Sequence, residues 1–290
     1  KSVKKLKRKG AKIVIIAHQG RKGDNDFLGL KQHSRIFNKY TKIKFVEDII
    51  GKKAIDEINS LKDGEALLLE NVRFLDDEMK DEVDSNLVRT LSGICDLYIN
   101  DAFSVSHRKQ ASITSFPKVM KSCMGWMMQK ELENLDKLDE NCLFILGGTK
   151  PEDNIFLVDK KNVLTCGIFG QLCRIAEGFN FGAQNKFLEK YKENIKNLKK
   201  YSSRVQKPID FAVNHTGKRE ELELEGFPSK YEIFDIGKKT ISLYKEKIRK
   251  AKSIFMRGTA GYTEEEKFSY GTREILKAIA SSKAYSVIGG

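Results

Sequence analysis

Short apolar runs rich in β-branched residues recur along this chain and alternate with stretches of helical periodicity, from AKIVIIAH near the first residue to AYSVIGG at the last. Such runs are typical of strands buried on both faces, and helical stretches between them favour β-α-β units with parallel strands. The sequence therefore predicts an α/β fold built from doubly wound, Rossmann-like parallel sheets. A chain of 290 residues is long enough for two such domains, each with its own core.

The best candidate for a domain boundary is the segment MGWMMQKELENLDKLDEN, whose apolar spacing predicts a helix. It separates a half whose strands end in cations from a half whose strands end in glycine. We therefore expect an N-terminal domain at 1–122, an interdomain helix at 123–138 and a C-terminal domain at 139–290. With only 4 prolines in the chain, a flexible Pro-rich linker is not expected, and the helix should act as a hinge.

Cationic side chains follow three of the expected strands in the first half. His18 and Arg21 follow IVIIAHQGR, Arg73 follows LLLENVRF and Arg108 follows YINDAFSVSHR. Because ligands of open α/β sheets bind outside the carboxyl ends of the strands, these groups should converge on one small anion. Either arginine taken alone has a simpler interpretation as a solvated surface charge.

Glycines take the same place in the second half. They are Gly147, Gly148, Gly167, Gly258, Gly261, Gly289 and Gly290, and Lys150 follows the first pair. Glycine lets backbone N–H groups approach a phosphate, and a nearby lysine adds a mobile positive charge. No G-x-x-x-x-G-K-[ST] loop is present, and each glycine alone is typical of an ordinary turn. Their shared position favours a nucleotide site.

The net charge of +13 permits a nucleic-acid-binding protein as a competing hypothesis. Lysines mixed with glutamate along helix faces, without interleaved aromatic residues, instead indicate a solvated surface. Five cysteines form an odd set without a C-x-x-C pair, so neither a zinc site nor a disulfide framework is expected. The lack of a long apolar run or a secretory pattern at the start favours a cytoplasmic protein away from membranes.

These segments, in this order, resemble phosphoglycerate kinase, and the archaeal branch most of all. The resemblance lies in AHQGRKGDNDF, GEALLLENVRF, DLYINDAFSVSHRKQAS, FILGGTKPED and RGTAGYTEEEKFSYGT, and it spans essentially the whole chain. It implies phosphoryl transfer between 1,3-bisphosphoglycerate with ADP and 3-phosphoglycerate with ATP, in glycolysis and gluconeogenesis, with Mg²⁺ on the nucleotide. It further implies a cytoplasmic monomer whose partners are these small molecules.

The resemblance also assigns roles to individual residues. The substrate loop of the family falls on His18, Gln19, Gly20 and Arg21, and its two later substrate arginines fall on Arg73 and Arg108. Lys150 is the lysine of the nucleotide loop that contains Gly147 and Gly148, and Glu264 holds the ribose. Gly167, Gly258 and Gly261 line the adenosine side, and Gly289 and Gly290 begin the glycine turn under the transferring phosphoryl group. No protein ligand to a metal is assigned.

Two departures from the family pattern bear on activity. The family has a second lysine near the transferring group, and here that position is Asn154, which carries no charge. Arg257 or Lys160 is the nearest candidate to replace it, whereas Thr259 in place of a proline matters less. The chain also resembles a fragment, since further substrate, phosphate and magnesium residues of the family are expected before Lys1 and beyond the last residue. A paralogue that binds both ligands without efficient transfer is the alternative, and this chain by itself is expected to be inactive.

Overall fold

The computed structural model describes residues 1–289, and the chain separates into two compact units, Lys1–Glu133 and Asn134–Gly290. Gly290, one of the expected nucleotide-binding glycines, lies outside the described residues. The division between the units falls within helix α6 (Trp126–Leu135). The domain limits expected from the sequence stay a prediction. None of the helices in residues 1–289 is both long and apolar enough to cross a membrane.

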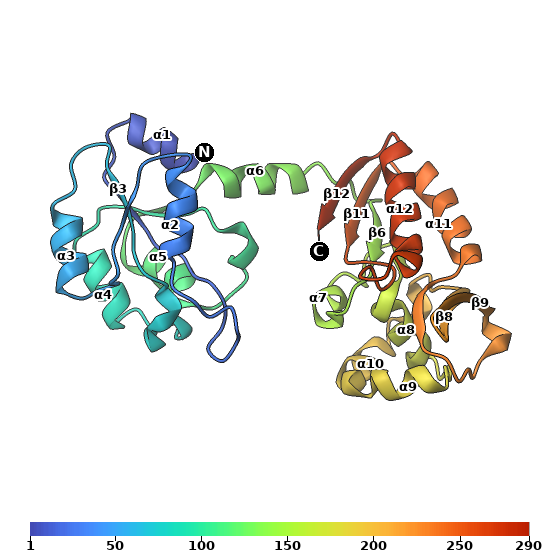
Figure 1. Cartoon of the computed structure of the whole chain (residues 1–290). Helices are drawn as coiled ribbons and strands as arrows, with labels where there is room; N and C mark the ends of the chain where they lie inside the picture. The colour runs from blue at the N-terminus through green and yellow to red at the C-terminus, as the bar shows by residue number, and fades with distance from the viewer. Residues whose placement is uncertain (290) are drawn as a thin grey trace. The chain divides into compact units, whose positions relative to one another are not determined.

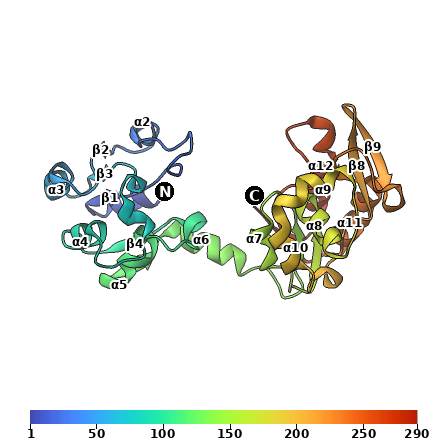
Figure 2. The same cartoon turned by 90° about the horizontal axis from the view of Figure 1, so that it is seen from below.

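The first unit contains short helices and two small parallel sheets (Figure 1). Its helices are α1 (Ser2–Arg8), α2 (Lys31–Asn38), α3 (Lys52–Asn59), α4 (Asn86–Ser92) and α5 (Phe116–Val119), and its strands are β1 (Ile13–Ile15), β2 (Lys44–Phe45), β3 (Ala66–Leu68), β4 (Tyr98–Asn100) and β5 (Ser122–Met124). One sheet has the order β1-β3-β2, and the other pairs β4 with β5. Figures 1 and 2 show α4 and α5 lying together in both views.

Strand β3 is the centre of the three-stranded sheet, and both of its faces are buried. Leu67 belongs to a cluster with residues of α3 and α4, whereas Ala66 and Leu68 belong to a second cluster that contains Leu30 and Ile43. Successive side chains of a strand point to opposite faces, so a strand covered on both sides needs a continuous apolar run. This is why EALLLEN could be identified as a strand from its sequence.

The ends of two helices follow from local chemistry. At the end of α1, Gly10 has a φ of 82°, and the N–H of Ala11 donates to the carbonyl of Leu6 at 3.2 Å, which is how a glycine commonly ends a helix. Helix α6 begins later than the sequence predicted, because Ser122–Met124 pairs with β4 as strand β5. The Asp101 carboxylate then accepts hydrogen bonds from the first turn of α6, including Met127 N at 2.8 Å.

The second unit contains a four-stranded parallel sheet of order β12-β11-β6-β7 and a three-stranded antiparallel sheet of order β10-β8-β9. Its strands are β6 (Leu143–Leu146), β7 (Asn162–Thr165), β8 (Asp210–His215), β9 (Lys218–Glu223), β10 (Ile233–Ile236), β11 (Ser253–Arg257) and β12 (Tyr285–Gly289). Its helices are α7 (Pro151–Ile155), α8 (Gly167–Ala176), α9 (Ala183–Leu188), α10 (Lys192–Leu198), α11 (Lys238–Lys250) and α12 (Tyr270–Ser281).

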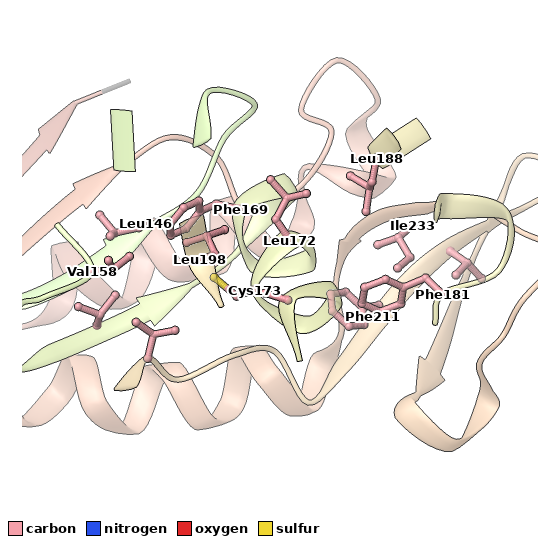
Figure 3. Close-up of a cluster of buried hydrophobic side chains, with 14 residues drawn as sticks. Leu146, Val158, Phe169, Leu172, Cys173, Phe181, Leu188, Leu198, Phe211 and Ile233 are labelled. Atoms are coloured by element: carbon pink, nitrogen blue, oxygen red, sulfur yellow. The ribbon is translucent and has the colours of Figure 1, made fainter. Parts of the chain in front are cut away.

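Apolar clusters cover both faces of the parallel sheet. Figure 3 shows the first, in which Leu146 at the end of β6 packs with Phe169 and Leu172 of α8 and with Phe211 of β8. The second lies among β6, β11, α11 and α12 and includes the fully buried Tyr244. Helices on both faces are the doubly wound arrangement that the sequence predicted.

The antiparallel hairpin β8–β9 was not predicted, because the segment NHTGKREE looks like a polar loop. Thr216 and Gly217 join the two strands, with φ angles of 49° and 81°. Positive φ at both central residues is the geometry of a type I′ hairpin turn, which is strained for threonine and easy for glycine. Strand β9 is charged along much of its length, so no apolar run marked it as a strand.

Candidate functional site

The four predicted cations of the first unit lie close enough to act on one another electrostatically. Burial, then the positive charges of Arg73 and Arg108, lower the pKa of His18 to about 4. The pKa of Arg73 is lowered by burial and by the charges of Arg108 and Arg21. Like charges gathered on one face are unfavourable unless an anion neutralises them, so this cluster has the character of an anion site.

Asn71 fixes the loop that carries His18 and Gln19. Its side chain is fully buried and donates to the carbonyl of Gln19 at 2.8 Å and to that of Leu28 at 2.9 Å. The same side chain accepts a hydrogen bond from the backbone N–H of Arg73 at 3.1 Å. One amide therefore positions both the substrate loop after β1 and the arginine after β3. The sequence gave no sign of this role for Asn71.

Gly20 cannot be replaced in this loop. Its φ is 66°, and a Cβ there would lie 2.5 Å from the backbone of Asp26. The Arg73 guanidinium also donates to the carbonyl of Gly20 through Nη1. Within residues 1–289, the buried atoms Arg73 Nε and Gln19 Oε1 have no hydrogen-bond partner. Buried polar atoms are normally paired, so these two are available to a ligand.

A buried carboxylate lies behind Arg73. Glu78 is fully buried and accepts hydrogen bonds from Ser112 N at 2.9 Å and from Ser112 Oγ at 2.7 Å. Burial raises the pKa of Glu78, and these hydrogen bonds together with the charge of Arg73 oppose that rise. Sequence reasoning missed Glu78, because an acidic residue in DDEMK looks like a surface group.

Arg108, His107 and Asp101 belong to one segment but differ in burial and in hydrogen-bond partners. The Arg108 side chain is half-buried, and no hydrogen bond or ion pair holds its guanidinium within residues 1–289. His107 is exposed. Asp101, in the same segment, caps α6 and accepts a hydrogen bond from Ser2 Oγ at 2.5 Å. The charge of Arg108 nevertheless reaches the cluster, since it lowers the pKa values of His18 and Arg73.

In the second unit, the predicted glycines bring three strand ends into backbone contact. Gly147 N donates to Arg257 O and Gly148 N to Thr259 O, both at 2.8 Å, and Gly167 N donates to Ala260 O at 3.1 Å. No other residue fits at these positions. A Cβ built on Gly147 would lie 2.4 Å from Thr259 O, and one built on Gly167 would lie 2.6 Å from the same atom. A Cβ built on Gly258 would lie 2.6 Å from Gly147 C. These glycines thus let the loops close on one another.

Gly261 is packed against a buried ion pair. A Cβ there would lie 2.3 Å from Asp235 Oδ1, and Asp235 forms an ion pair with Arg219 of β9 at 2.6 Å. The Gly271 N–H also donates to Asp235 at 2.7 Å. Burial raises the pKa of Asp235 to about 6, against the effect of these partners. The unpredicted hairpin therefore helps to position the loop that carries Gly261 and Glu264.

Lys150 and Glu264 are both exposed, and neither forms an ion pair within residues 1–289. Asn154 is buried instead, and its Nδ2 donates to Gly147 O at 2.8 Å. Its Oδ1 is buried without a partner in the same part of the chain. Asn154 thus ties the glycine loop to α7, a role that the sequence alone did not indicate.

Arg257, suggested as a replacement for the missing lysine charge, is committed elsewhere. Its Nη2 forms an ion pair with Asp153 Oδ2 at 2.6 Å. Lys160 is exposed in the turn after α7. The side chain of Arg257 therefore brings no net charge to the glycine loops, because Asp153 neutralises it.

The fold and these two clusters define an α/β protein of the phosphotransferase type, with an anion site in one unit and glycine-lined strand ends in the other. The phosphoglycerate kinase family matches residues 1–290. The phosphoglycerate kinase of Methanothermus fervidus is 39% identical over 315 residues, which cover 100% of this chain and 77% of that protein. The chain belongs to the phosphoglycerate kinase family.

Solved structures agree with this assignment. The crystal structure of phosphoglycerate kinase from Pyrococcus horikoshii matches with a TM-score of 0.89 at 35% identity, covering 100% of this chain and 79% of that one. The structure of the enzyme from Coxiella burnetii matches with a TM-score of 0.76 at 25% identity, covering 100% and 78%. The two-unit α/β architecture is therefore that of phosphoglycerate kinases from distant sources.

Proposed function

We propose that this chain catalyses phosphoryl transfer between 1,3-bisphosphoglycerate with ADP and 3-phosphoglycerate with ATP. The observation that carries the proposal is the cluster of Arg21, Arg73 and Arg108 around His18 in the first unit, where burial and then the charges of Arg73 and Arg108 lower the pKa of His18 to about 4. A three-carbon acid with a phosphate supplies the negative charge that such a cluster needs. The planar guanidinium of arginine donates paired hydrogen bonds, which suits both the carboxylate and the phosphate oxygens of this acid.

Each residue of the anion site has a separate role in the proposal. His18 is neutral near pH 7 because its pKa is about 4, so it donates a single N–H hydrogen bond to the acid. Arg21, Arg73 and Arg108 supply the positive charge. Gln19 offers its buried unpartnered Oε1 to a hydroxyl of the acid, and Gly20 permits the turn that brings these groups together.

The second unit supplies the nucleotide site in this proposal. Lys150 contacts the nucleotide phosphates beside Gly147 and Gly148, and Glu264 accepts a hydrogen bond from the ribose. The adenosine side is lined by Gly167, Gly258 and Gly261, and the glycine turn begins at Gly289 and Gly290. One observation fits a nucleotide: Lys150 is exposed and forms no ion pair within residues 1–289, so its charge is available to the phosphates.

Magnesium would reach this site on the nucleotide. Mg²⁺ usually keeps several waters and binds through substrate phosphates rather than through a protein cage. There it would neutralise part of the negative charge of the nucleotide phosphates.

The reaction needs positioning more than covalent chemistry. The attacking group of 3-phosphoglycerate is already a carboxylate, so no general base is required. Phosphoryl transfer passes through a loose transition state with the attacking and leaving oxygens in line, and fixed positive charge stabilises it. Lys150 is the residue that we propose for this catalytic role.

We also propose that the 290-residue chain is inactive by itself, or so slow that its turnover lies far below that of an ordinary kinase. Asn154 contributes a hydrogen-bond donor but no charge, and Asp153 neutralises Arg257. The partners are small molecules, without nucleic acid or membrane, and we propose a cytoplasmic monomer. The alternative is a paralogue that binds both ligands without efficient transfer.

The test is a coupled assay with ³¹P NMR. MgATP and 3-phosphoglycerate are incubated with the chain while glyceraldehyde-3-phosphate dehydrogenase and NADH consume the 1,3-bisphosphoglycerate. We expect ADP and NAD⁺ to form only when 3-phosphoglycerate is present, at a rate below the 1–100 s⁻¹ typical of kinases. A Lys150→Ala variant should lose this activity. ADP formation that ignores 3-phosphoglycerate would contradict the proposal.

A further inference from the structure

A cavity of about 440 Å³ lies at the amino ends of β6 and β7, near the end of α11. Leu143 and Asn162, which begin these two strands, form part of its wall. The glycine loops follow the carboxyl ends of the same strands. A strand rises about 3.3 Å per residue, so β6 alone separates the cavity from these loops by more than 10 Å. The cavity is therefore distinct from the proposed nucleotide site.

The lining of this cavity is strongly basic. Its charged residues are Lys161, Arg204, Lys247, Lys250 and Lys252, and no aspartate or glutamate is among its lining residues. Arg204 lies 3.6 Å from Asp159, and both of these side chains are mostly exposed. The four lysines take part in no ion pair within residues 1–289. A concave surface with charges of one sign raises the local concentration of the opposite ion.

The cations come from three separate segments of the second unit. Lys247 and Lys250 lie in the last turn of α11, where they also complement the helix dipole. That effect does not explain Lys161, which precedes β7, or Arg204, which follows α10. Convergence of charges from distant parts of the chain on one hollow indicates a ligand rather than a helix end alone.

The remaining polar groups support the same interpretation. The side-chain amides of Asn141 and Gln206 line the cavity without a hydrogen-bond partner in residues 1–289. The floor is fixed, because Gln206 N donates to Val163 O and Gln206 O accepts from Thr165 N, each at 2.9 Å. No aromatic residue lines the cavity, so it has no platform on which nucleic-acid bases could stack.

We propose that this cavity binds a compact oligophosphate, a small molecule with two or more linked phosphate groups. Its volume falls within the range of about 300–1,000 Å³ that small-molecule sites occupy. Lysine acts as a mobile point charge without the fixed fork of arginine, which suits the several oxygens of a phosphate chain. Binding there relieves repulsion among the lysines and so stabilises the second unit.

The test uses inorganic tripolyphosphate, titrated by calorimetry at low and at raised salt. We expect the double variant Lys161→Gln/Lys250→Gln to lose at least about tenfold in affinity, and raised salt to weaken binding to the unchanged chain. A second double variant, Lys186→Gln/Lys283→Gln, changes the net charge equally at exposed lysines outside the cavity. It should bind within about twofold of the unchanged chain.

The proposal fails if the Lys161/Lys250 variant binds tripolyphosphate as well as the unchanged chain, or if both double variants lose affinity equally. A titration with ADP identifies the source of the phosphates. Two ADP sites in the unchanged chain and one in the Lys161/Lys250 variant would indicate the phosphate tail of a nucleotide, and one site in both would indicate inorganic oligophosphate. The ADP site that remains in the Lys161/Lys250 variant is the proposed nucleotide site at the glycine loops, so its affinity tests the proposed function independently of the cavity.

Discussion

Replacement of Arg108 by glutamine gives a clean test of the anion site. The Arg108 guanidinium has no hydrogen bond or ion pair within residues 1–289, so Arg108→Gln removes a charge without breaking a contact of the folded chain. Its charge nevertheless reaches His18 and Arg73, because it contributes to the lowered pKa of each. The variant therefore has two independent readouts, one without ligand and one with it.

The expected sizes follow from the structure. The pKa of His18 is about 4 against an ordinary value of 6.5, and Arg108 is the smallest of three causes after burial and Arg73. Its removal should recover less than about one third of that difference, so the pKa of His18 should rise but stay below about 5. Loss of a charged hydrogen bond to the acid should weaken 3-phosphoglycerate binding by about 1.5–3 kcal/mol, which is about 10- to 150-fold.

Two measurements check these values. An NMR titration of the imidazole signals gives the pKa of His18 in the unchanged and Arg108→Gln chains without ligand, and calorimetry gives the affinities for 3-phosphoglycerate and MgADP. MgADP binding should stay within about twofold, because Arg108 belongs to the first unit. The reasoning is refuted if the pKa of His18 is unchanged and 3-phosphoglycerate binds the variant as tightly as before.

Three further predictions concern other parts of the chain. Because burial and the nearby arginines hold the pKa of His18 at about 4, below its ordinary value of 6.5, its contribution to stability is complete above about pH 6.5 and is lost as the pH falls towards 4. Denaturant midpoints from pH 7 to 4 should therefore fall less for His18→Gln than for the unchanged chain. Gly147→Ala puts a Cβ 2.4 Å from a backbone carbonyl and should lower the free energy of unfolding by about 1–3 kcal/mol or more, whereas Gly226→Ala, whose nearest neighbour is 3.4 Å away, should stay within about 0.5 kcal/mol in urea unfolding. Asn154→Lys keeps a donor and adds a charge, so kcat in the coupled assay should rise at least about tenfold with nucleotide affinity changed only a few-fold; an unchanged kcat would show that the charge is supplied by another group.

The features that the sequence predicted well are those set by strong local patterns. The continuous apolar run in EALLLEN predicted a strand, and Arg73 was therefore expected just after the end of that strand. The glycines after β6 and β11 were identified by position, and their role in closing the loops became visible only from the backbone distances to Thr259 O. The general architecture thus depends on patterns that a single sequence displays.

The features that were missed depend on contacts between distant residues. Glu78 looks like a surface acid until Ser112, far along the chain, is placed beside it. The β8–β9 hairpin was hidden because its second strand is charged and its turn holds Thr216 at a positive φ. Asn154 was interpreted only as a missing charge, whereas the fold also gives it a structural hydrogen bond to Gly147. Tertiary context assigns such roles, and sequence periodicity does not display it.

In the proposed function, the acid and the nucleotide occupy separate sites on the two units. Hydrogen exchange followed by mass spectrometry, on the 290-residue chain with each ligand in turn, tests it most directly. We expect 3-phosphoglycerate to slow exchange in segments 16–28 and 70–78, and MgADP to slow exchange in segments 147–155 and 257–264. Protection of the same unit by both ligands, or protection of neither pair of segments at saturating ligand, would contradict the account.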